Sequence, residues 1–347
     1  MRAVGELLGE VLAQDTVIRT LRRGLGSGRV HHALLFDGPR GVGKELAAFG
    51  LAQALVCEAR AGGDRACGDC SACARAVIRE SVGPKGVVQR EKMPVHPDVV
   101  VIERGLHDPA RIGRRSPETQ EISIDQIRTL VLARAQFGPH EGHAKVFIVR
   151  RAEELSISAA NALLKTLEEP GPRTHFVLLT EARDWLLPTI RSRAQLVRFG
   201  ALPETALLRL LAARGIDGPR AEEAARLAGG SLEAALEHAD PDALTDRREF
   251  ATRAFAAIGA KDASQAMGLA EAEKKDKVAL RAKLEHLAAA LHARAREGID
   301  GPEALACAEQ HRIALEALVD LDANASPQLV VEAMLLGMRA VAPPRAA

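Results

Sequence analysis

The sequence predicts an α/β domain that is followed by a small helical lid and an all-helical C-terminal domain. Two observations lead to this prediction. Within the first 199 residues, four short apolar runs alternate with helical patterns, as in a parallel sheet covered on both faces. Beyond Phe199 these runs disappear, and helical periodicity rich in Ala and Leu continues instead. We therefore expect domains over residues 1–199, 200–240 and 241–347.

The composition indicates a soluble globular protein. Hydrophobic residues make up 47% of the 347 residues and charged residues 27%, which suits a well-buried core. The formal net charge of +1 gives no global electrostatic attraction to DNA. The sequence has no signal-peptide pattern and no run of roughly 18 apolar residues that could span a membrane. These features predict a cytoplasmic protein with reduced cysteines and no membrane partner.

The first elements of the α/β domain follow from apolar runs and glycine breaks. Ala33–Phe36 is an apolar strand, and a glycine loop and a helix come after it. Residues 98–103 form a continuous apolar run that is typical of a strand buried on both faces. Two stretches rich in charge, Gly and Pro, 80–94 and 104–120, predict exposed loops. A helix is expected over 122–137.

The second part of the domain continues the alternation. Apolar runs at 145–150 and 174–180 predict two further strands. Between them lies a helical pattern that Ser156 or Ser158 caps and Pro170 ends.

The loop after the first strand has the spacing of a phosphate-binding P-loop. Its four characteristic positions are Gly38, Gly41, Gly43 and Lys44. The glycines let backbone N–H groups surround a phosphate, and Lys44 would reach its oxygens. The next position should be Ser or Thr, whose hydroxyl coordinates Mg²⁺, but here it is Glu45. ATP binding therefore stays an open question.

A P-loop enzyme also needs an acidic residue at the end of a neighbouring strand, for the metal and the attacking water. The strand at 145–150 ends in Arg150 and Arg151 instead. Glu153 and Glu154 lie beyond the strand end and are weak substitutes. The site has thus lost both its metal hydroxyl and its acid, and we expect it not to hydrolyse ATP.

Four of the five cysteines fall within 17 residues. They are Cys57, Cys67, Cys70 and Cys73. In a reducing compartment, four thiolates at this spacing match a tetrahedral Zn²⁺ site. Because the cysteines fill all four positions, the predicted zinc is structural. Unrelated cysteines and a redox role for the Cys67–Cys70 pair are the alternatives.

Several motifs together resemble one family. HHALLFDGPRGVGK at 31–44 and the cysteine cluster are followed by SAANALLKTLEEP at 158–170 and LLPTIRSRAQ at 186–195. GGSLEAAL at 229–236 and NASPQLVVEAMLL at 324–336 extend the pattern over essentially the whole chain. Their order resembles the clamp-loader ATPase family of bacterial DNA polymerase III. The resemblance implies an AAA+ domain with an inserted zinc module, a helical lid and a C-terminal collar domain that mediates oligomerisation.

Departures from the family pattern point to its inactive companion subunit, delta prime, rather than to the active gamma or tau subunits. Active members have Thr where this chain has Glu45, and Asp-Glu where it has Arg150-Arg151. They also have a nucleotide-sensing Arg in the lid where it has Glu233. The lack of a long tau-like C-terminal extension fits the same interpretation.

Other family residues are retained. Ser192-Arg193 matches the family's Ser-Arg-Cys motif, with Ala194 in place of Cys. The resemblance implies that Arg193 acts in trans as an arginine finger at a neighbour's ATP site. Arg191 is close enough in sequence to be the finger instead, and a surface role for both is the plainer alternative. Thr180 stands at the family's polar sensor position.

Two further basic residues match positions that track a DNA backbone in related loaders. They are Arg128 and Lys165, and the alternative for each is an ordinary solvated helix face.

The resemblance implies a hetero-oligomeric partner set for this chain. It comprises the gamma or tau and delta subunits and, through the complex, the sliding clamp and primer-template DNA. The chain would then belong to the DNA polymerase III holoenzyme, a nucleotidyltransferase, and assist clamp loading during replication. An active gamma- or tau-like AAA+ ATPase is one rival interpretation. A free-standing zinc-dependent DNA-binding protein is the other.

Overall fold

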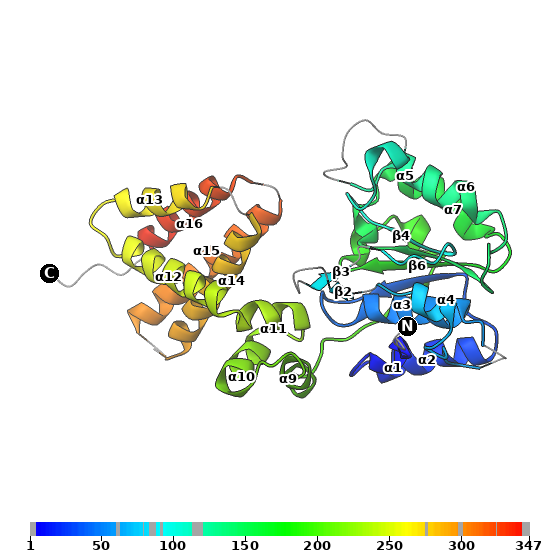
Figure 1. Ribbon diagram of the computed structural model, residues 1–347. Helices are drawn as coiled ribbons and strands as arrows, with labels where there is room; N and C mark the ends of the chain where they lie inside the picture. Colours follow the sequence, from blue (N-terminus) through cyan, green and yellow to red (C-terminus); the bar gives the residue numbers. More distant parts are fainter. Residues whose placement is uncertain are drawn as a thin grey trace. The chain divides into compact units, whose positions relative to one another are not determined.

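The computed structural model describes residues 5–59, 63–78, 80–82, 88–90, 93–112, 121–274, 277–297, 301–323 and 325–341. The chain divides into two compact units, residues 1–236 and 237–347, which are shown in Figure 1. The domain boundaries expected from the sequence, at 199/200 and 240/241, stay predictions.

The first unit is built on a five-stranded parallel sheet. In spatial order its strands are β4 (Val99–Ile102), β5 (Lys145–Val149), β6 (Thr174–Thr180), β1 (Ala33–Asp37) and β7 (Gln195–Arg198). Every residue of β4 and β5 is buried. The four strands expected from the sequence are present, and β7 is a fifth that was not predicted.

Helices cover both faces of this sheet (Figure 1). On one face lie α1 (Leu7–Glu10), α2 (Asp15–Gly26) and α3 (Lys44–Val56). On the other lie α5 (Ile124–Ile127), the π-helical turn η2 (Arg128–Leu132), α6 (Ala133–Ala135) and α7 (Ile157–Glu168). The Ser156 hydroxyl accepts the Ala159 N–H and caps α7. The short helix α8 (Pro188–Arg191) leads into β7.

Short elements decorate the connections. They are α4 (Ser71–Arg75), η1 (Pro109–Ile112), η3 (Ala152–Glu154) and η4 (Arg183–Trp185). Within the predicted loop 80–94, β2 (Glu80–Val82) and β3 (Val88–Arg90) pair antiparallel, so a small hairpin replaces part of that loop. The rest of this loop at 83–87, 91 and 92, and residues 113–120 of the second loop, lie outside the described residues.

Residues 200–240, the expected lid, contain three helices. They are α9 (Glu204–Ala212), α10 (Gly218–Leu227) and α11 (Leu232–Ala239), the last of which crosses the boundary between the two units. The loop before α11 is tied to the chain that enters the lid, because the Leu202 N–H donates to the Gly230 carbonyl at 2.9 Å.

The second unit is all helical in its described residues, as predicted. Its helices are α12 (Pro241–Ile258), α13 (Ser264–Ala272), α14 (Lys277–Glu297), α15 (Pro302–Asp322) and α16 (Pro327–Ala340). They surround a core of Leu, Ala and Met side chains in which Leu284, Leu291 and Leu335 are fully buried. Among the helices that the structure describes, none is long and apolar enough to cross a membrane.

Candidate functional site

The P-loop joins β1 to α3 at the carboxyl edge of the sheet. Gly43 has φ +98°, a left-handed conformation that favours glycine, and it starts α3. Lys44 is only 8% exposed. Its ammonium group donates to the carbonyls of Gly38 and Pro39, each at 2.5 Å. Burial lowers the pKa of Lys44, and nearby carboxylates, chiefly Glu181, oppose that shift. The lysine therefore turns back onto its own loop.

The two departures from the catalytic pattern meet in space. Arg150 follows β5 and donates to Glu45, in the first turn of α3, at 2.8 Å. It also donates to Glu103 at 2.7 Å. The Arg150 side chain is 14% exposed and lies 5.8 Å from the centre of the Phe49 ring. An ion pair thus connects the two positions where an active P-loop enzyme has its metal-binding hydroxyl and its acid.

Of the two acidic candidates beyond the strand end, Glu154 forms an ion pair with Arg151 at 3.2 Å. The candidate that acts on Lys44 of the loop is Glu153. Its Oε1 accepts the Glu181 N–H at 3.4 Å, whereas its Oε2 is buried without a hydrogen-bond partner. Burial raises the pKa of Glu181, and the charge of Lys44 lowers it in opposition. The Thr180 hydroxyl, at the predicted sensor position, accepts the Ala182 N–H at 3.1 Å.

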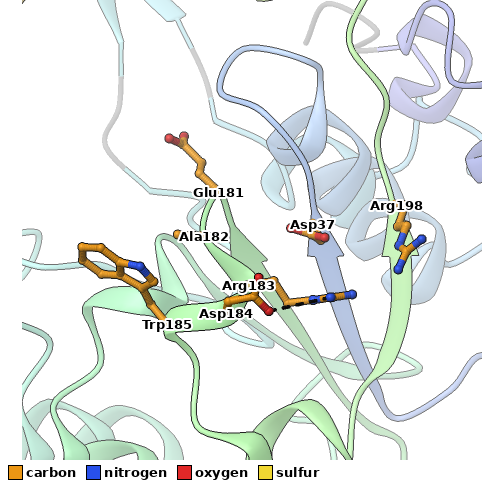
Figure 2. A pocket seen from close by; sticks show the side chains of 7 residues that line it. All are labelled: Asp37, Glu181, Ala182, Arg183, Asp184, Trp185 and Arg198. Atoms are coloured by element: carbon orange, nitrogen blue, oxygen red, sulfur yellow. Dashed lines mark ion pairs between the residues drawn. The ribbon is translucent and has the colours of Figure 1, made fainter. Parts of the chain in front are cut away.

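A cavity of about 460 Å³ opens at the same edge of the sheet (Figure 2). It is lined by Asp37, Glu181, Ala182, Arg183, Asp184, Trp185 and Arg198. Trp185, the only tryptophan in the chain, is 79% exposed. This cavity was not anticipated, because its residues come from the ends of β1, β6 and β7 and share no motif.

The predicted finger, Arg193, lies just after α8. It forms an ion pair with Glu168 of α7, and its Nη1 donates to the Thr189 carbonyl at 3.0 Å. The alternative finger, Arg191, pairs instead with Asp184 at 2.8 Å. The two arginines therefore have different carboxylate partners.

The two predicted DNA contacts lie on packed neighbouring helices, since α5 and η2 pack against α7. Arg128 begins the π-helical turn and Lys165 lies on α7. Both are exposed, and neither forms a side-chain hydrogen bond or ion pair with any described residue.

The four clustered cysteines converge. Their sulfur atoms all lie within 4.8 Å of one another. The sulfur of Cys67 lies 3.5 Å from that of Cys57 and 3.8 Å from that of Cys73. Four thiolates at about 2.3 Å from a tetrahedral zinc would be roughly 3.8 Å apart. The backbone N–H groups of Cys67, Cys70 and Cys73 each donate to a cysteine sulfur at 3.4 Å. The residues present therefore fit a structural zinc site.

Burial and hydrogen bonding act in opposite directions on these thiols. Burial raises the pKa of Cys73. Burial would also raise the pKa of Cys67, but N–H donors from Asp69 and Cys70 outweigh it and hold the pKa at about 7.

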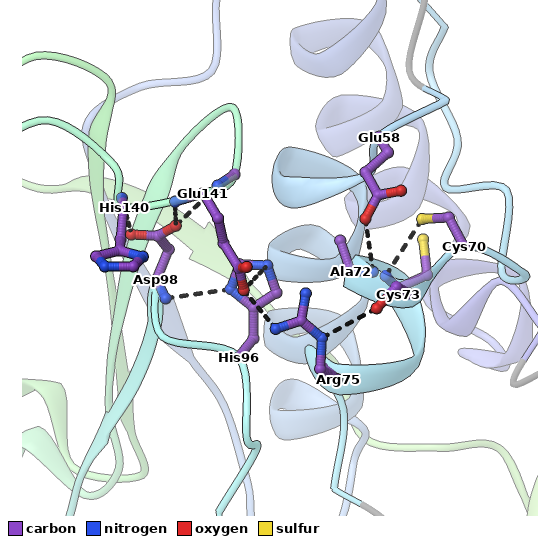
Figure 3. A network of polar contacts seen from close by, with 11 residues as sticks. Glu58, Cys70, Ala72, Cys73, Arg75, His96, Asp98, His140 and Glu141 are labelled. Atoms are coloured by element: carbon purple, nitrogen blue, oxygen red, sulfur yellow. Dashed lines mark hydrogen bonds and ion pairs between the residues drawn. The ribbon is translucent and has the colours of Figure 1, made fainter.

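A polar network ties the cysteine cluster to the sheet (Figure 3). Arg75, which ends α4, forms an ion pair with Glu141. The Asp98 carboxylate is fully buried and accepts the N–H groups of His140, Glu141 and Gly142 at 2.6–2.9 Å. Burial alone would raise the pKa of Asp98, but these three donors lower it. The Asp98 carboxylate thus fixes the loop that holds the cysteine module.

Sequence comparison identifies the family. The sequence model of a family described as "DNA polymerase III, delta subunit" matches residues 13–203, which is more than half of the chain. The chain belongs to the DNA polymerase III clamp-loader subunit family. The match covers the P-loop, the cysteine cluster and the segment around Arg193.

Relatives in this clamp-loader family have two kinds of name. DNA polymerase III subunit gamma/tau of Mycobacterium tuberculosis is 34% identical over 203 residues, covering 58% of this chain and 30% of the relative. DNA polymerase III subunit delta′ of Haemophilus influenzae is 36% identical over 179 residues, covering 52% of this chain and 44% of the relative. The aligned part is thus less than half the length of each relative.

A solved structure supports the fold. A DNA polymerase III gamma subunit-related protein from Thermotoga maritima matches with a TM-score of 0.50 at 18% identity, covering 93% of this chain and 98% of that one. At this identity the match shows the fold alone. It confirms the predicted AAA+ fold of an α/β body followed by a helical region.

Proposed function

We propose that this clamp-loader subunit is of the delta-prime type and does not hydrolyse ATP itself. The ion pair between Glu45 and Arg150 is the observation that supports this assignment. A Mg²⁺ ion at this position would face a guanidinium, which cannot coordinate a metal or accept a proton from water. Glu45 is already neutralised by Arg150, so it offers no free carboxylate in compensation.

In this proposal the retained arginine acts on a neighbour. Arg193 serves as the finger that stabilises charge on the phosphoryl group at an adjacent gamma or tau site. Its present partner, Glu168, has a side chain that is 47% exposed. Exposed ion pairs of this kind contribute about 0–1 kcal/mol, so a triphosphate readily displaces the carboxylate. Arg193 is therefore held in place but is free to change partner.

The complex that follows is hetero-oligomeric and cytoplasmic. The chain would assemble with gamma or tau and delta subunits through its C-terminal helices, as a collar domain. The loader then opens the sliding clamp and places it on primer-template DNA, as part of the DNA polymerase III holoenzyme. Within it, Arg128 and Lys165 contact DNA phosphates without sequence preference. Replacing either residue with Ala should reduce the slope of log affinity against log salt by about one unit.

The cysteine cluster holds a structural Zn²⁺ in this proposal. Its ligands are Cys57, Cys67, Cys70 and Cys73, which leave no open position for water or substrate. The metal would stabilise the module between α3 and α4 and take no part in phosphoryl transfer.

ATP hydrolysis by the isolated chain tests this assignment. With Mg²⁺ and ATP, we expect the wild-type rate to equal that of the Lys44→Ala variant, because both lack a functional metal site. Steady-state phosphate release measures it. Hydrolysis that Lys44→Ala abolishes would instead identify an active gamma- or tau-like motor, the alternative that the relatives named gamma/tau favour.

A further inference from the structure

The lid rests directly on the P-loop. The Leu232 N–H, in the first turn of α11, donates to the carbonyl of Gly41 at 3.2 Å. The Ser231 hydroxyl accepts the Ala234 N–H and caps the same helix. The start of α11 is therefore held by a hydrogen bond from the lid to the loop that would otherwise surround a phosphate.

At this contact the lid lies so close to the loop that only glycine fits at position 41. A Cβ atom on Gly41 would lie 2.7 Å from both the Glu233 nitrogen and the Ser231 hydroxyl. Gly41 also has φ +70°. Any side chain at position 41 would therefore force the lid and the loop apart.

The two charged side chains of the loop, Arg40 and Lys44, already have hydrogen-bond partners within the chain. Arg40 donates to Glu233 at 2.5 Å, and Lys44 donates to two loop carbonyls. The carboxylates of Asp37, Glu153, Glu181 and Glu233 all act electrostatically on Lys44. A triphosphate would have to displace these bonds and enter among four carboxylates, which Coulomb repulsion disfavours.

We propose that the P-loop of this chain is a nucleotide-independent clasp that holds the lid on the α/β body. The clasp consists of Arg40 and Gly41 on the loop and Leu232 and Glu233 on the lid. This inference rests on the proposed function, because a subunit that does not hydrolyse ATP needs no lid that opens at each round of hydrolysis. The lid then keeps one position whether or not ATP is present, and ATP does not fill the loop.

Amide hydrogen exchange of the full chain tests the clasp at the Leu232 N–H. In the wild type, exchange over residues 228–239 should be the same with and without Mg²⁺-ATP. Glu233→Arg replaces an attraction by a repulsion. Because the variant loses one exposed ion pair and gains a like-charge repulsion of similar size, lid exchange should become about two- to thirtyfold faster. The double variant Arg40→Glu, Glu233→Arg restores the pair with reversed charges and should restore the slow exchange.

A matched control lies in the other unit. Arg281 and Glu285 form a similarly exposed pair at 2.9 Å, so Glu285→Arg should leave lid exchange unchanged. Slower lid exchange in wild type on adding ATP would overturn the clasp, as would a Glu233→Arg variant that exchanges like wild type. An unrescued double variant would overturn it as well. These results are independent of ATP turnover, which alone decides whether the chain is a motor subunit.

Discussion

At the scale of single residues, Arg150 forms two ion pairs and Glu45 forms one among the residues that the structure describes. Arg150 bonds both Glu45 and Glu103, and its side chain is largely buried, whereas that of Glu45 is 40% exposed. The loss of either group therefore has unequal consequences. Without Glu45 the guanidinium still has Glu103. Without Arg150, Glu45 loses its ion pair and Glu103 keeps only its longer contact with Arg151, at 3.5 Å.

This asymmetry gives a stability prediction. Arg150→Met should lower the free energy of unfolding by about 1–3 kcal/mol, because it removes the ion pairs to both Glu45 and Glu103. Glu45→Gln should cost less than about 1 kcal/mol, because the lost pair is partly exposed. Chemical denaturation of the two variants measures the difference. Equal costs would contradict the arrangement described.

A second residue, Asp98, gives a pH-dependent prediction. Its pKa is lowered from 3.8 in the folded chain, so its stabilising effect is present above that value and is lost as pH falls through the folded pKa. Asp98→Asn should cost about 1–3 kcal/mol at pH 7, because it removes charge-assisted hydrogen bonds. The cost should begin to shrink below about pH 4, where Asp98 of the unfolded chain takes up a proton, and it should vanish only once pH falls below the lowered pKa of the folded chain.

Urea unfolding at pH 7 and at pH 3.5 measures this effect. Asp217→Asn is the control, since that side chain is exposed and makes no capping bond, and it should stay within about 0.5 kcal/mol of wild type. A cost for Asp98→Asn that does not change with pH would contradict the role given to the carboxylate.

The sequence shows Glu45 and Arg150 to be unusual, but it does not show that they pair. In the sheet, β6 separates β5 from β1, so the end of β5 is not adjacent to the strand that leads into the P-loop. The contact arises because α3 packs across β5 and β6. Such a long-range packing direction leaves no trace in local periodicity.

At the scale of elements, long apolar runs and capped helices were predictable. The run at 174–180 is β6, and the helix before Pro170 is α7, with Ser156 as its cap. The edge strand β7 was missed because only Val197 among its four residues is fully buried, which leaves no apolar run to detect. The hairpin of β2 and β3 was missed because three-residue strands are too short to show a period.

The cysteine module gives the prediction at this scale. Anaerobically purified chain should contain one zinc per molecule, and Cys73→Ser should lose that metal and lower Tm, because four thiolates close the site. Cys307 lies outside the cluster, so Cys307→Ser should keep both the zinc and the wild-type Tm. Metal analysis together with thermal unfolding checks this. A wild-type chain that is essentially free of metal would refute the zinc proposal.

At the scale of the whole molecule, Trp185 and Arg193 belong to one segment that the ion pair of Asp184 with Arg191 holds together. Trp185 is 79% exposed, and the chain has no Tyr, so tryptophan emission reports on this segment alone. If the segment meets a gamma or tau subunit, adding that subunit should bury the ring and shift its emission to shorter wavelength.

A titration with purified gamma or tau subunit tests this, and Trp185→Phe, which removes the signal, is the control. Complex formation without any change in emission would place the partner elsewhere.

We propose that this chain does not hydrolyse ATP itself and supplies an arginine to the ATP site of its neighbour. Single-turnover ATP hydrolysis by a reconstituted loader on primed DNA tests it most directly, with Arg193→Ala compared against Arg191→Ala. We predict that Arg193→Ala slows the site facing this chain by about 10³-fold or more, while Arg191→Ala leaves it near the wild-type rate. An unchanged rate in Arg193→Ala, or an equal loss in Arg191→Ala, would contradict the assignment of Arg193 as the finger.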